Sequence, residues 1–259
     1  VASSLHGVPH ALENRFTIDY ALGCIYKTLT NGNTSERSIA GLMLDFLDGV
    51  ERENRFFNQM TKIYGRVVGA PRNANTSFLR ELSNADFSSL FSQVPFVIKG
   101  LDNLPKNPEN IYFYNHLAAI PENTLANGHA FSIDSHFISA MILQKKYGDG
   151  GQRIVRTSRS TEFWRNGYYA RLDNIFVHNQ ESDWLDETDE EKKSRKESLF
   201  YNAQTAFDMG RPLAIAPEGT SETPNNITDL SPGELKPGAF LLAEKLKPEP
   251  LLVPIALAN

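Results

Sequence analysis

The 259-residue chain contains a single cysteine and no long uninterrupted run of apolar residues. Cys24 therefore has no partner for an internal disulfide, which favours a reducing compartment. A helix needs roughly 20 consecutive apolar residues to cross a bilayer, and no stretch of this chain approaches that length. The first residues also lack the basic start and apolar core of a signal peptide. We expect a cytoplasmic protein that is soluble or bound only peripherally to a membrane.

Short motifs that mark several common enzyme classes are absent as well. The chain has no G-x-S-x-G nucleophile elbow, no phosphate-binding P-loop, no dinucleotide-binding glycine motif and no H-E-x-x-H zinc site. These absences argue against a serine hydrolase of the usual kind, a nucleoside triphosphatase and a dinucleotide-dependent enzyme. We expect neither a cofactor nor a bound metal.

Charge is unevenly distributed along this acidic chain, whose formal net charge is −5. Between Gln144 and Arg171, seven basic residues stand against two acidic ones, which leaves a local balance of +5. The acidic run ESDWLDETDEE follows. Nucleic-acid binding normally draws on a broader positive face, so the local excess favours a small anionic ligand such as a phosphate group. The basic residues are Lys145, Lys146, Arg153, Arg156, Arg159, Arg165 and Arg171.

The spacing of apolar residues predicts an α/β protein with two parts. Residues 1–93 carry apolar residues at helical spacing and predict an N-terminal helical bundle. Over residues 94–259, short β-rich runs alternate with helical ones, which predicts an α/β domain with a mixed sheet flanked by helices. The chain starts without methionine and stops in an apolar run, so we expect it to be trimmed at both ends. The expected strands of the second part are 96–100, 111–117, 154–158, 174–179, 212–217 and 251–258, and its expected helices are 135–147, 190–209 and 237–246.

The stretch NGHAFSIDSHF places a histidine five residues before an aspartate, where an apolar helical run begins. Asp134 falls where an N-cap residue would, and His129 stands about one turn earlier. A carboxylate can fix the tautomer of a neighbouring imidazole and stabilise its charged form, so the pair could act as a general base. Taken alone, this spacing occurs by chance in many chains.

A second stretch, PLAIAPEGTSE, ends an expected strand in a polar turn. Open α/β sheets bind ligands at the carboxyl ends of their strands. Glu218 could orient polar groups there, Gly219 would let the backbone approach a substrate, and Thr220 could donate a hydrogen bond. Lys236 then opens the apolar helix KPGAFLLAEKL, which precedes the strand LLVPIALA.

The order of these pieces resembles the glycerolipid acyltransferase superfamily, which includes glycerol-3-phosphate and lysophosphatidate acyltransferases. The shared features are H-x4-D before a helix, a basic segment with a strand, P-E-G-T, the helix start KPGAFLLA and an apolar strand containing V-P-I. The resemblance covers residues 95–259 and implies that His129 is the catalytic base, with Asp134 as its partner. Pro254 matches the proline of the family's fourth block. The resemblance also implies that the P-E-G-T turn contacts the phosphate of the acceptor, through Glu218, Gly219 and Thr220.

Two departures from the family's pattern decide the remaining site residues. The second block lacks its usual terminal arginine, so we expect Arg171 to contact the phosphate, with Lys236 as a further substrate-binding residue. The dipeptide Asn115-His116 looks like the asparagine and histidine that usually begin the family's first motif. The residue five positions after His116, however, is a proline and not the aspartate of that motif. We therefore assign the base to His129 and expect His116 to have a structural or supporting role.

The resemblance implies transfer of a fatty acyl group from a thioester of coenzyme A or acyl carrier protein to a hydroxyl of a phosphorylated glycerol, a step of phospholipid biosynthesis. The histidine would remove the hydroxyl proton during attack on the thioester carbonyl, with no covalent intermediate. By analogy, the N-terminal helices and the lack of a membrane span favour glycerol-3-phosphate over lysophosphatidate as the acceptor. The implied partners are the thioester donor, the phosphorylated acceptor and a membrane surface, and nucleic acid is not among them.

Two other interpretations stay open. A metal-dependent hydrolase could use His129, Asp134 and His136, with His116 as a further candidate ligand, since imidazole and carboxylate are ordinary zinc ligands. A metal analysis of the purified protein would separate this interpretation from acyl transfer. A catalytically silent lipid-binding relative on the same fold would be distinguished by an activity measurement.

Overall fold

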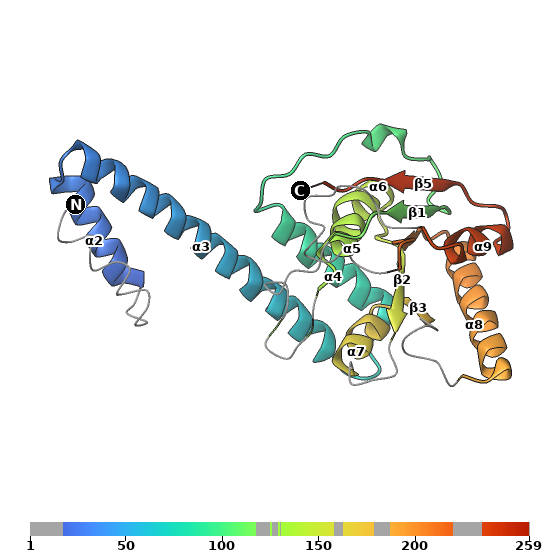
Figure 1. The fold of residues 1–259 in the computed structure, drawn as a ribbon. Helices are drawn as coiled ribbons and strands as arrows, with labels where there is room; N and C mark the ends of the chain where they lie inside the picture. Colours follow the sequence, from blue (N-terminus) through green and yellow to red (C-terminus); the bar gives the residue numbers. More distant parts are fainter. Residues whose placement is uncertain are drawn as a thin grey trace. The chain divides into compact units, whose positions relative to one another are not determined.

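The computed structural model describes residues 18–117, 125, 129, 131–157, 163–178, 187–219 and 235–258. The chain divides into two compact units, of which the first ends at Gln59 and the second begins at Met60. The sequence analysis placed this division after residue 93, because helices continue to that point. The last of those helices, however, belongs to the second unit, where it packs against the helices that follow the first strand (Figure 1).

Two helices form the described part of the first unit, α2 (Ile18–Asn31) and the first part of α3 (Thr34–Val68). Asn33 and Glu36 exchange two hydrogen bonds between side chain and backbone, at 2.9 and 3.0 Å, and so cap the start of α3. Cys24 is partly buried beside the core of this unit. The expected N-terminal helices are confirmed. The core consists of Ala21, Ile25, Ala40 and Leu47.

The second unit is built around a sheet whose described strands have the order β3-β2-β4-β1-β5. The α/β class is confirmed, and every pair between described strands is parallel, where the sequence analysis expected a mixed sheet. The strand expected at 96–100 is wrong, because these residues are irregular and turn at Gly100, with φ 73°, into the 3₁₀ helix η1 (Leu101–Asn103). The strands are β1 (Ile111–Tyr114), β2 (Gln152–Thr157), β3 (Ile175–His178), β4 (Leu213–Ile215) and β5 (Leu252–Ile255).

One face of the sheet is covered by α8 (Asp189–Asp208) and α9 (Gly238–Lys245), seen together in Figure 1. Ala203 and Phe207 of α8 and Leu242 of α9 are buried against it. Successive side chains of a strand point to opposite faces, so only alternate strand residues join this core. They are Ile111, Ile154, Ile175 and Leu213.

The opposite face carries a continuous helical stretch made of α5 (Ile133–Phe137), the π-helical segment η3 (Ile138–Leu143) and α6 (Gln144–Tyr147). This stretch packs on the other set of alternate strand residues. Helix α4 (Thr76–Phe91) packs against η3 and α5, and α7 (Phe163–Arg171) packs against α4. The buried residues of this core include Tyr112, Tyr114 and Ala214 from the sheet and Ile138, Ile142 and Leu143 from the helical stretch.

The helices expected at 135–147, 190–209 and 237–246 are confirmed, with small differences at their ends. Within the described part of the chain, no helix is both long and apolar enough to cross a membrane.

Strands β1 and β4 lie side by side and parallel, yet the helices that follow them cover opposite faces of the sheet. Among the described residues, the next helix after β1 is α5 on one face, whereas the next helix after β4 is α9 on the other. Neighbouring parallel strands whose connections diverge in this way form the topological switch point at which open α/β sheets bind ligands. The carboxyl ends of β1 and β4 are therefore the place to look for a site.

Candidate active site

A histidine and an aspartate meet at the carboxyl end of β1. His116 follows this strand by two residues, and Asp134 lies in the first turn of α5. Oδ2 of Asp134 accepts hydrogen bonds from Nδ1 of His116 and from the backbone N–H of Leu117, the latter at 2.9 Å, while its Oδ1 accepts the backbone N–H of Ser135 at 2.6 Å. The aspartate side chain is 2% exposed and the histidine side chain 19%. The pair is thus anchored in the interior, with the imidazole reaching the surface.

The structure corrects the pairing expected from the sequence, which joined Asp134 to His129. The carboxylate of Asp134 is bonded to His116. His129 is 0% exposed, and its ring centre lies 4.7 Å from those of both Tyr64 and Phe131. A ring enclosed by other rings cannot reach a substrate hydroxyl, so His129 has the surroundings of a packing residue.

Spacing along the chain misled the sequence analysis for a simple reason. His116 and Asp134 are 18 positions apart, whereas a search at the family's separation of five selects His129. The usable signal was the place of His116 directly after an apolar strand. Nothing in the sequence alone shows that the chain after His116 brings Asp134 back to it.

Glu218, which follows β4, forms a hydrogen bond to the backbone that follows β1. Its Oε2 accepts the backbone N–H of His116 at 2.7 Å, and the residue is 4% exposed. Gly219 follows with φ 74°, a conformation that favours glycine, and its N–H closes the turn on the carbonyl of Ala216 at 3.1 Å. The structure therefore brings two residues of the predicted P-E-G-T turn to the His116–Asp134 pair. Thr220 lies outside the described residues.

Asn115 makes the corresponding link between β1 and the chain beyond β5. Its Nδ2 donates to the carbonyl of Leu257 at 3.0 Å, and its Oδ1 accepts the N–H of Leu257 at 2.7 Å. Pro254 lies in β5, opposite Phe113 of β1. Side-chain hydrogen bonds thus fix the backbone at Asn115 and at His116, which holds the imidazole in place before any substrate arrives.

Two buried groups beside the pair are kept in their neutral forms. Burial raises the pKa of Tyr114, and the nearby negative charge of Asp134 raises it further. Burial also lowers the pKa of His136 well below its ordinary value. Nδ1 of His136 lies 2.7 Å from the carbonyl oxygen of Ser132, and its Nε2 lies 3.2 Å from the hydroxyl of Tyr168. His136 is therefore part of the packing that supports the start of α5.

Lys236 lies beside the same turn as Glu218. Its backbone N–H donates to the carbonyl of Pro217 at 2.9 Å. A Cβ placed on Gly219 would lie 3.7 Å from both Cδ and Cε of the lysine, so the methylene stem passes over this glycine. The residue is exposed. Its ammonium group thus stands in solvent next to the turn, where an anionic substrate could reach it.

Arg171 does not lie at this site, which corrects the expected contact with the phosphate. It ends α7 and precedes β3, whereas His116 and Glu218 follow their strands, so in a parallel sheet it belongs to the opposite edge. With its guanidinium it caps the end of α3, as cations near a helix C-terminus commonly do. The groups that accept its hydrogen bonds are the backbone carbonyls of Val67, Ala70 and Pro71.

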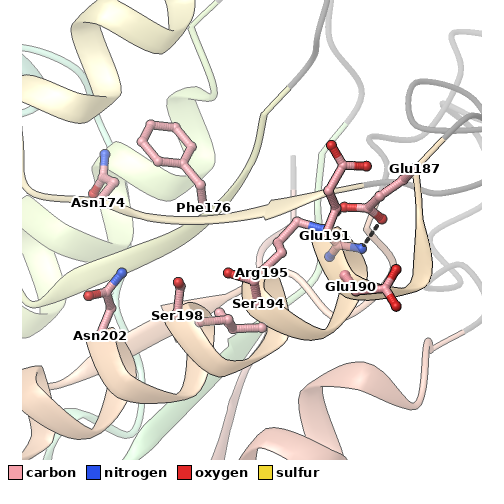
Figure 2. A pocket seen from close by; sticks show the side chains of 10 residues that line it. Asn174, Phe176, Glu187, Glu190, Glu191, Ser194, Arg195, Ser198 and Asn202 are labelled. Carbon is pink, nitrogen blue, oxygen red and sulfur yellow. Dashed lines mark hydrogen bonds and ion pairs between the residues drawn. The ribbon is translucent and has the colours of Figure 1, made fainter.

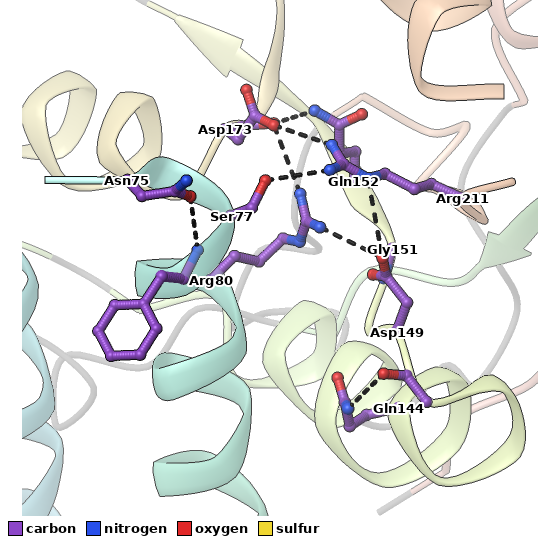
Figure 3. Close-up of polar contacts among 11 residues, drawn as sticks. Asn75, Ser77, Arg80, Gln144, Asp149, Gly151, Gln152, Asp173 and Arg211 are labelled. Atoms are coloured by element: carbon purple, nitrogen blue, oxygen red, sulfur yellow. Dashed lines mark hydrogen bonds and ion pairs between the residues drawn. The ribbon is translucent and has the colours of Figure 1, made fainter. Parts of the chain in front are cut away.

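Figure 3 shows a charged network at this same amino-terminal edge. The side chain of Arg80 is 4% exposed and reaches Asp149 at 3.2 Å and Asp173 at 3.4 Å. Arg211, just before β4, reaches Asp173 at 3.1 Å and the hydroxyl of Ser77 at 3.0 Å. Burial lowers the pKa of Arg80, and the charge of Asp149 opposes that shift. Each guanidinium has carboxylate partners, so this network stabilises the fold and offers little to a ligand.

Arg153 of the basic segment is used inside the protein and not offered to a ligand. Arg153 is 4% exposed, donates Nη1 to the hydroxyl of Ser135 at 3.3 Å and lies 5.5 Å from the ring centre of Tyr169. The side chains of Arg159 and Arg165 lie outside the described residues. Of the residues expected to contact the phosphate, the structure therefore places Glu218, Gly219 and Lys236 beside the pair.

Ser132 is a neighbour of His116 that the sequence analysis did not single out. Its hydroxyl oxygen lies 3.4 Å from Nε2 of His116, on the ring nitrogen that Asp134 does not contact. The S-x-D order before a helix was visible in the sequence. It gains meaning only when His116 is known to lie beside it.

A cavity of about 630 Å³ is lined by residues in and just before β3 and α8, and its lining does not include the pair (Figure 2). In its wall, Arg195 is held by two hydrogen bonds of 2.6 Å to Glu187. Glu190 and Glu191 also line it. Burying carboxylates against an acyl chain is unfavourable, and carboxylates repel a phosphate, so the cavity suits neither substrate.

No group of three or more His, Cys, Asp and Glu side chains is placed to hold a metal ion among the residues that the structure describes. The alternative metal site combined His129, Asp134 and His136, with His116 as a further candidate ligand. The nitrogens of His136 face a carbonyl and a hydroxyl, and Asp134 contacts His116. This geometry gives metal-dependent hydrolysis no support.

Comparison of the chain with models of protein families, with curated proteins and with solved structures finds no match.

Proposed function

We propose that the protein is an acyltransferase, which moves a fatty acyl group from a thioester of coenzyme A or acyl carrier protein to a hydroxyl of a phosphorylated glycerol. One observation carries the proposal: the His116–Asp134 pair lies at the switch point of a parallel sheet and is bonded to the glutamate of the P-E-G-T turn. The aspartate before the helix and the P-E-G-T turn, which are separate motifs in the sequence, thus lie together beside His116. We propose glycerol-3-phosphate ahead of lysophosphatidate as the acceptor, and phospholipid biosynthesis as the process.

His116 is the general base in this proposal, in place of His129. Asp134 accepts from Nδ1, so the hydrogen of the neutral imidazole lies on that nitrogen and Nε2 is left as an acceptor. The proton of an attacking hydroxyl would pass to Nε2 while Asp134 stabilises the imidazolium that forms. General-base help of this kind is worth roughly 10² to 10⁴ in rate.

Glu218 and Lys236 have separate roles. Glu218 fixes the backbone of His116 through the 2.7 Å hydrogen bond and so maintains the direction of the imidazole. The ammonium group of Lys236, next to Gly219, supplies a positive charge for the phosphate of the acceptor. Thr220 stays a candidate phosphate contact from the sequence motif.

A lipid product also favours contact with a membrane surface. A water-soluble acceptor and thioester would yield an acylated product that partitions into a bilayer, so we propose a cytoplasmic enzyme that binds membranes peripherally. Such binding would include attraction to anionic headgroups and weaken as salt rises.

The deciding experiment measures acyl transfer from palmitoyl-coenzyme A and from palmitoyl-acyl carrier protein. Each donor is assayed in parallel with glycerol-3-phosphate, lysophosphatidate and unphosphorylated glycerol. We expect transfer to a phosphorylated acceptor, with little transfer to glycerol. A folded protein that transfers no acyl group to any acceptor would support the catalytically silent relative instead. Release of free fatty acid at the same rate with and without acceptor would indicate a thioester hydrolase.

A further inference from the structure

We propose that Ser132 is a nucleophile that carries the acyl group between the two substrates, so that transfer proceeds through an acyl-serine intermediate. This inference rests on the proposed acyl transfer, but it replaces the direct attack on the thioester that the resemblance implies with two steps through a covalent intermediate. It starts from the position of the Ser132 hydroxyl, whose oxygen lies 3.4 Å from Nε2 of His116.

The three side chains follow the order of a catalytic triad. The hydroxyl of Ser132 faces Nε2 of His116, and Nδ1 of the same ring is bonded to Asp134. Triads are recognised by this geometry and by the roles of the groups, and they occur on unrelated folds with different orders along the chain. The 3.4 Å separation is longer than the usual 2.6 to 3.2 Å, as is common for such contacts before a substrate is bound.

The backbone at Ser132 gives an independent reason to look at this hydroxyl. Ser132 is the N-cap residue of α5, but its side chain makes no capping hydrogen bond. A serine at an N-cap usually accepts an N–H of the first helical turn, because this satisfies a donor that has no partner within the helix. Here the hydroxyl approaches the imidazole of His116 instead.

Other groups hold the backbone of Ser132 while its hydroxyl faces His116. Its carbonyl accepts from the hydroxyl of Ser135 at 2.9 Å, and Nδ1 of His136 lies 2.7 Å from the same oxygen. The backbone N–H of His136 also donates to this carbonyl, at 3.2 Å. A nucleophile needs such support, since small displacements of a reacting group cost much of its rate.

The two steps can be written with all atoms accounted for. In the first, the Ser132 oxygen forms a bond to the thioester carbonyl carbon as its proton passes to Nε2 of His116. The carbon–sulfur bond then breaks, and the thiol of the carrier leaves with that proton. In the second, the acceptor hydroxyl loses its proton to Nε2 and attacks the serine ester. The ester bond to Ser132 breaks, and the proton returns to the serine oxygen. No oxidant, metal or other co-reactant is required.

The test begins with palmitoyl-coenzyme A and no acceptor, followed by an acid quench and intact-protein mass spectrometry. We expect wild type to gain the mass of one acyl group, mapped by peptide analysis to Ser132, and to lose it when the preferred acceptor is added. Ser132→Ala should form no adduct and lose transfer by about a thousandfold or more, while Ser139→Ala, in the same helical stretch, should retain both. Initial rates at several concentrations of both substrates should give the parallel lines of a ping-pong reaction.

A cysteine variant protects the test against simple misfolding. Ser132→Cys should accept the acyl group as a thioester, which neutral hydroxylamine releases more readily than the serine ester. Wild type that transfers acyl groups with intersecting kinetic lines and forms no adduct would overturn the inference and leave the proposed acyltransferase intact. The same follows if Ser132→Ala retains more than about a tenth of the activity. A wild-type protein that forms neither adduct nor product with any acceptor would overturn both.

Discussion

The two edges of the parallel sheet both carry polar and charged groups, but they use them differently. At the amino-terminal edge, Arg80 and Arg211 face Asp149 and Asp173, and each guanidinium is matched by carboxylates. At the carboxyl-terminal edge, Asp134 holds one nitrogen of His116 and leaves the other directed at a hydroxyl. Charge that is matched within the protein stabilises it, whereas a group left able to exchange a proton can do chemistry.

This difference also explains why counting basic residues pointed to the wrong arginine. Arg171 and Arg153 both belong to the +5 segment, yet the first caps a helix and the second is buried beside Ser135. A charge count over a sequence segment adds residues that lie far apart in the folded protein, so it does not locate a positively charged surface. The place of a residue before or after its strand is the better guide in a parallel sheet, because this decides the edge on which it lies.

The largest effect is expected from the histidine of the carboxyl-terminal edge. His116→Ala should lower kcat by roughly 10² to 10⁴, because it removes the group that takes the proton. Its thermal unfolding temperature should fall only modestly, since the buried carboxylate of Asp134 loses the imidazole but keeps the backbone N–H groups of Leu117 and Ser135. His129→Phe is the matched variant: it keeps an aromatic ring in the aromatic cluster and should retain activity. Both are measured by transfer kinetics and by thermal unfolding. The reverse result, with His129→Phe inactive but folded and His116→Ala active, would return the base to His129.

Substitutions at the amino-terminal edge should change the free energy of unfolding and leave the rate of acyl transfer unchanged. Arg80→Ala should lower the free energy of unfolding by about 2 to 3 kcal/mol, less than for a fully buried pair because both carboxylate partners are partly exposed. The exposed pair between Arg66 and Asp86 provides a control, and Arg66→Ala should cost less than about 1 kcal/mol.

Denaturant unfolding and transfer kinetics on the same samples would check this. The Michaelis constants and kcat of the folded Arg80→Ala protein should equal those of wild type. A large change in the Michaelis constant for the acceptor would mean that this network serves the substrate, and the contrast between the two edges would fail.

Arg171 tests the assignment of edges more directly, because the sequence predicted a substrate contact for it. Arg171→Ala should lower the free energy of unfolding by about 1 to 2 kcal/mol, through the loss of charged hydrogen bonds to the carbonyls at the end of α3. Lysine should restore part of this stability, since its ammonium group keeps the charge but has all its donors on one nitrogen and lacks the guanidinium fork. Kinetic constants for both substrates should stay unchanged. A rise confined to the acceptor would reinstate the predicted phosphate contact.

The sequence predicted the architecture better than it predicted the site. Apolar runs bounded by turn residues located all the described strands, because each strand contributes apolar residues to the packing on the two faces of the sheet. The strand expected at 96–100 shows the limit of that signal, since an apolar run can also lie in an irregular segment. The pattern of residues within each strand could not predict the strand order, in which β4 lies between β1 and β2.

For the site, the sequence located Asp134 and the P-E-G-T turn but missed the partner histidine. The turn is encoded locally, by a strand followed by a glycine at φ 74°. The contact between His116 and Asp134 is not, because it depends on how the chain returns over 18 positions. Ser132 was missed for the same reason, since its contact with His116 joins residues that are distant in sequence.

The smallest effect is expected from Lys236, which tests whether the carboxyl-terminal edge also recognises charge. Lys236→Ala should raise the Michaelis constant for the phosphorylated acceptor by about three- to tenfold and leave that of the thioester unchanged, because an exposed ammonium group in water contributes little more than 1 kcal/mol. Lys236→Arg should keep most of the affinity. Lys245→Ala, at the other end of α9, is the control for a general loss of positive charge. The wild-type advantage over Lys236→Ala should shrink as salt is raised, since exposed charges are screened. Equal effects of the Lys236 and Lys245 substitutions would assign the attraction to the overall charge of the protein, and the phosphate contact would then have to come from Thr220 or from another basic residue.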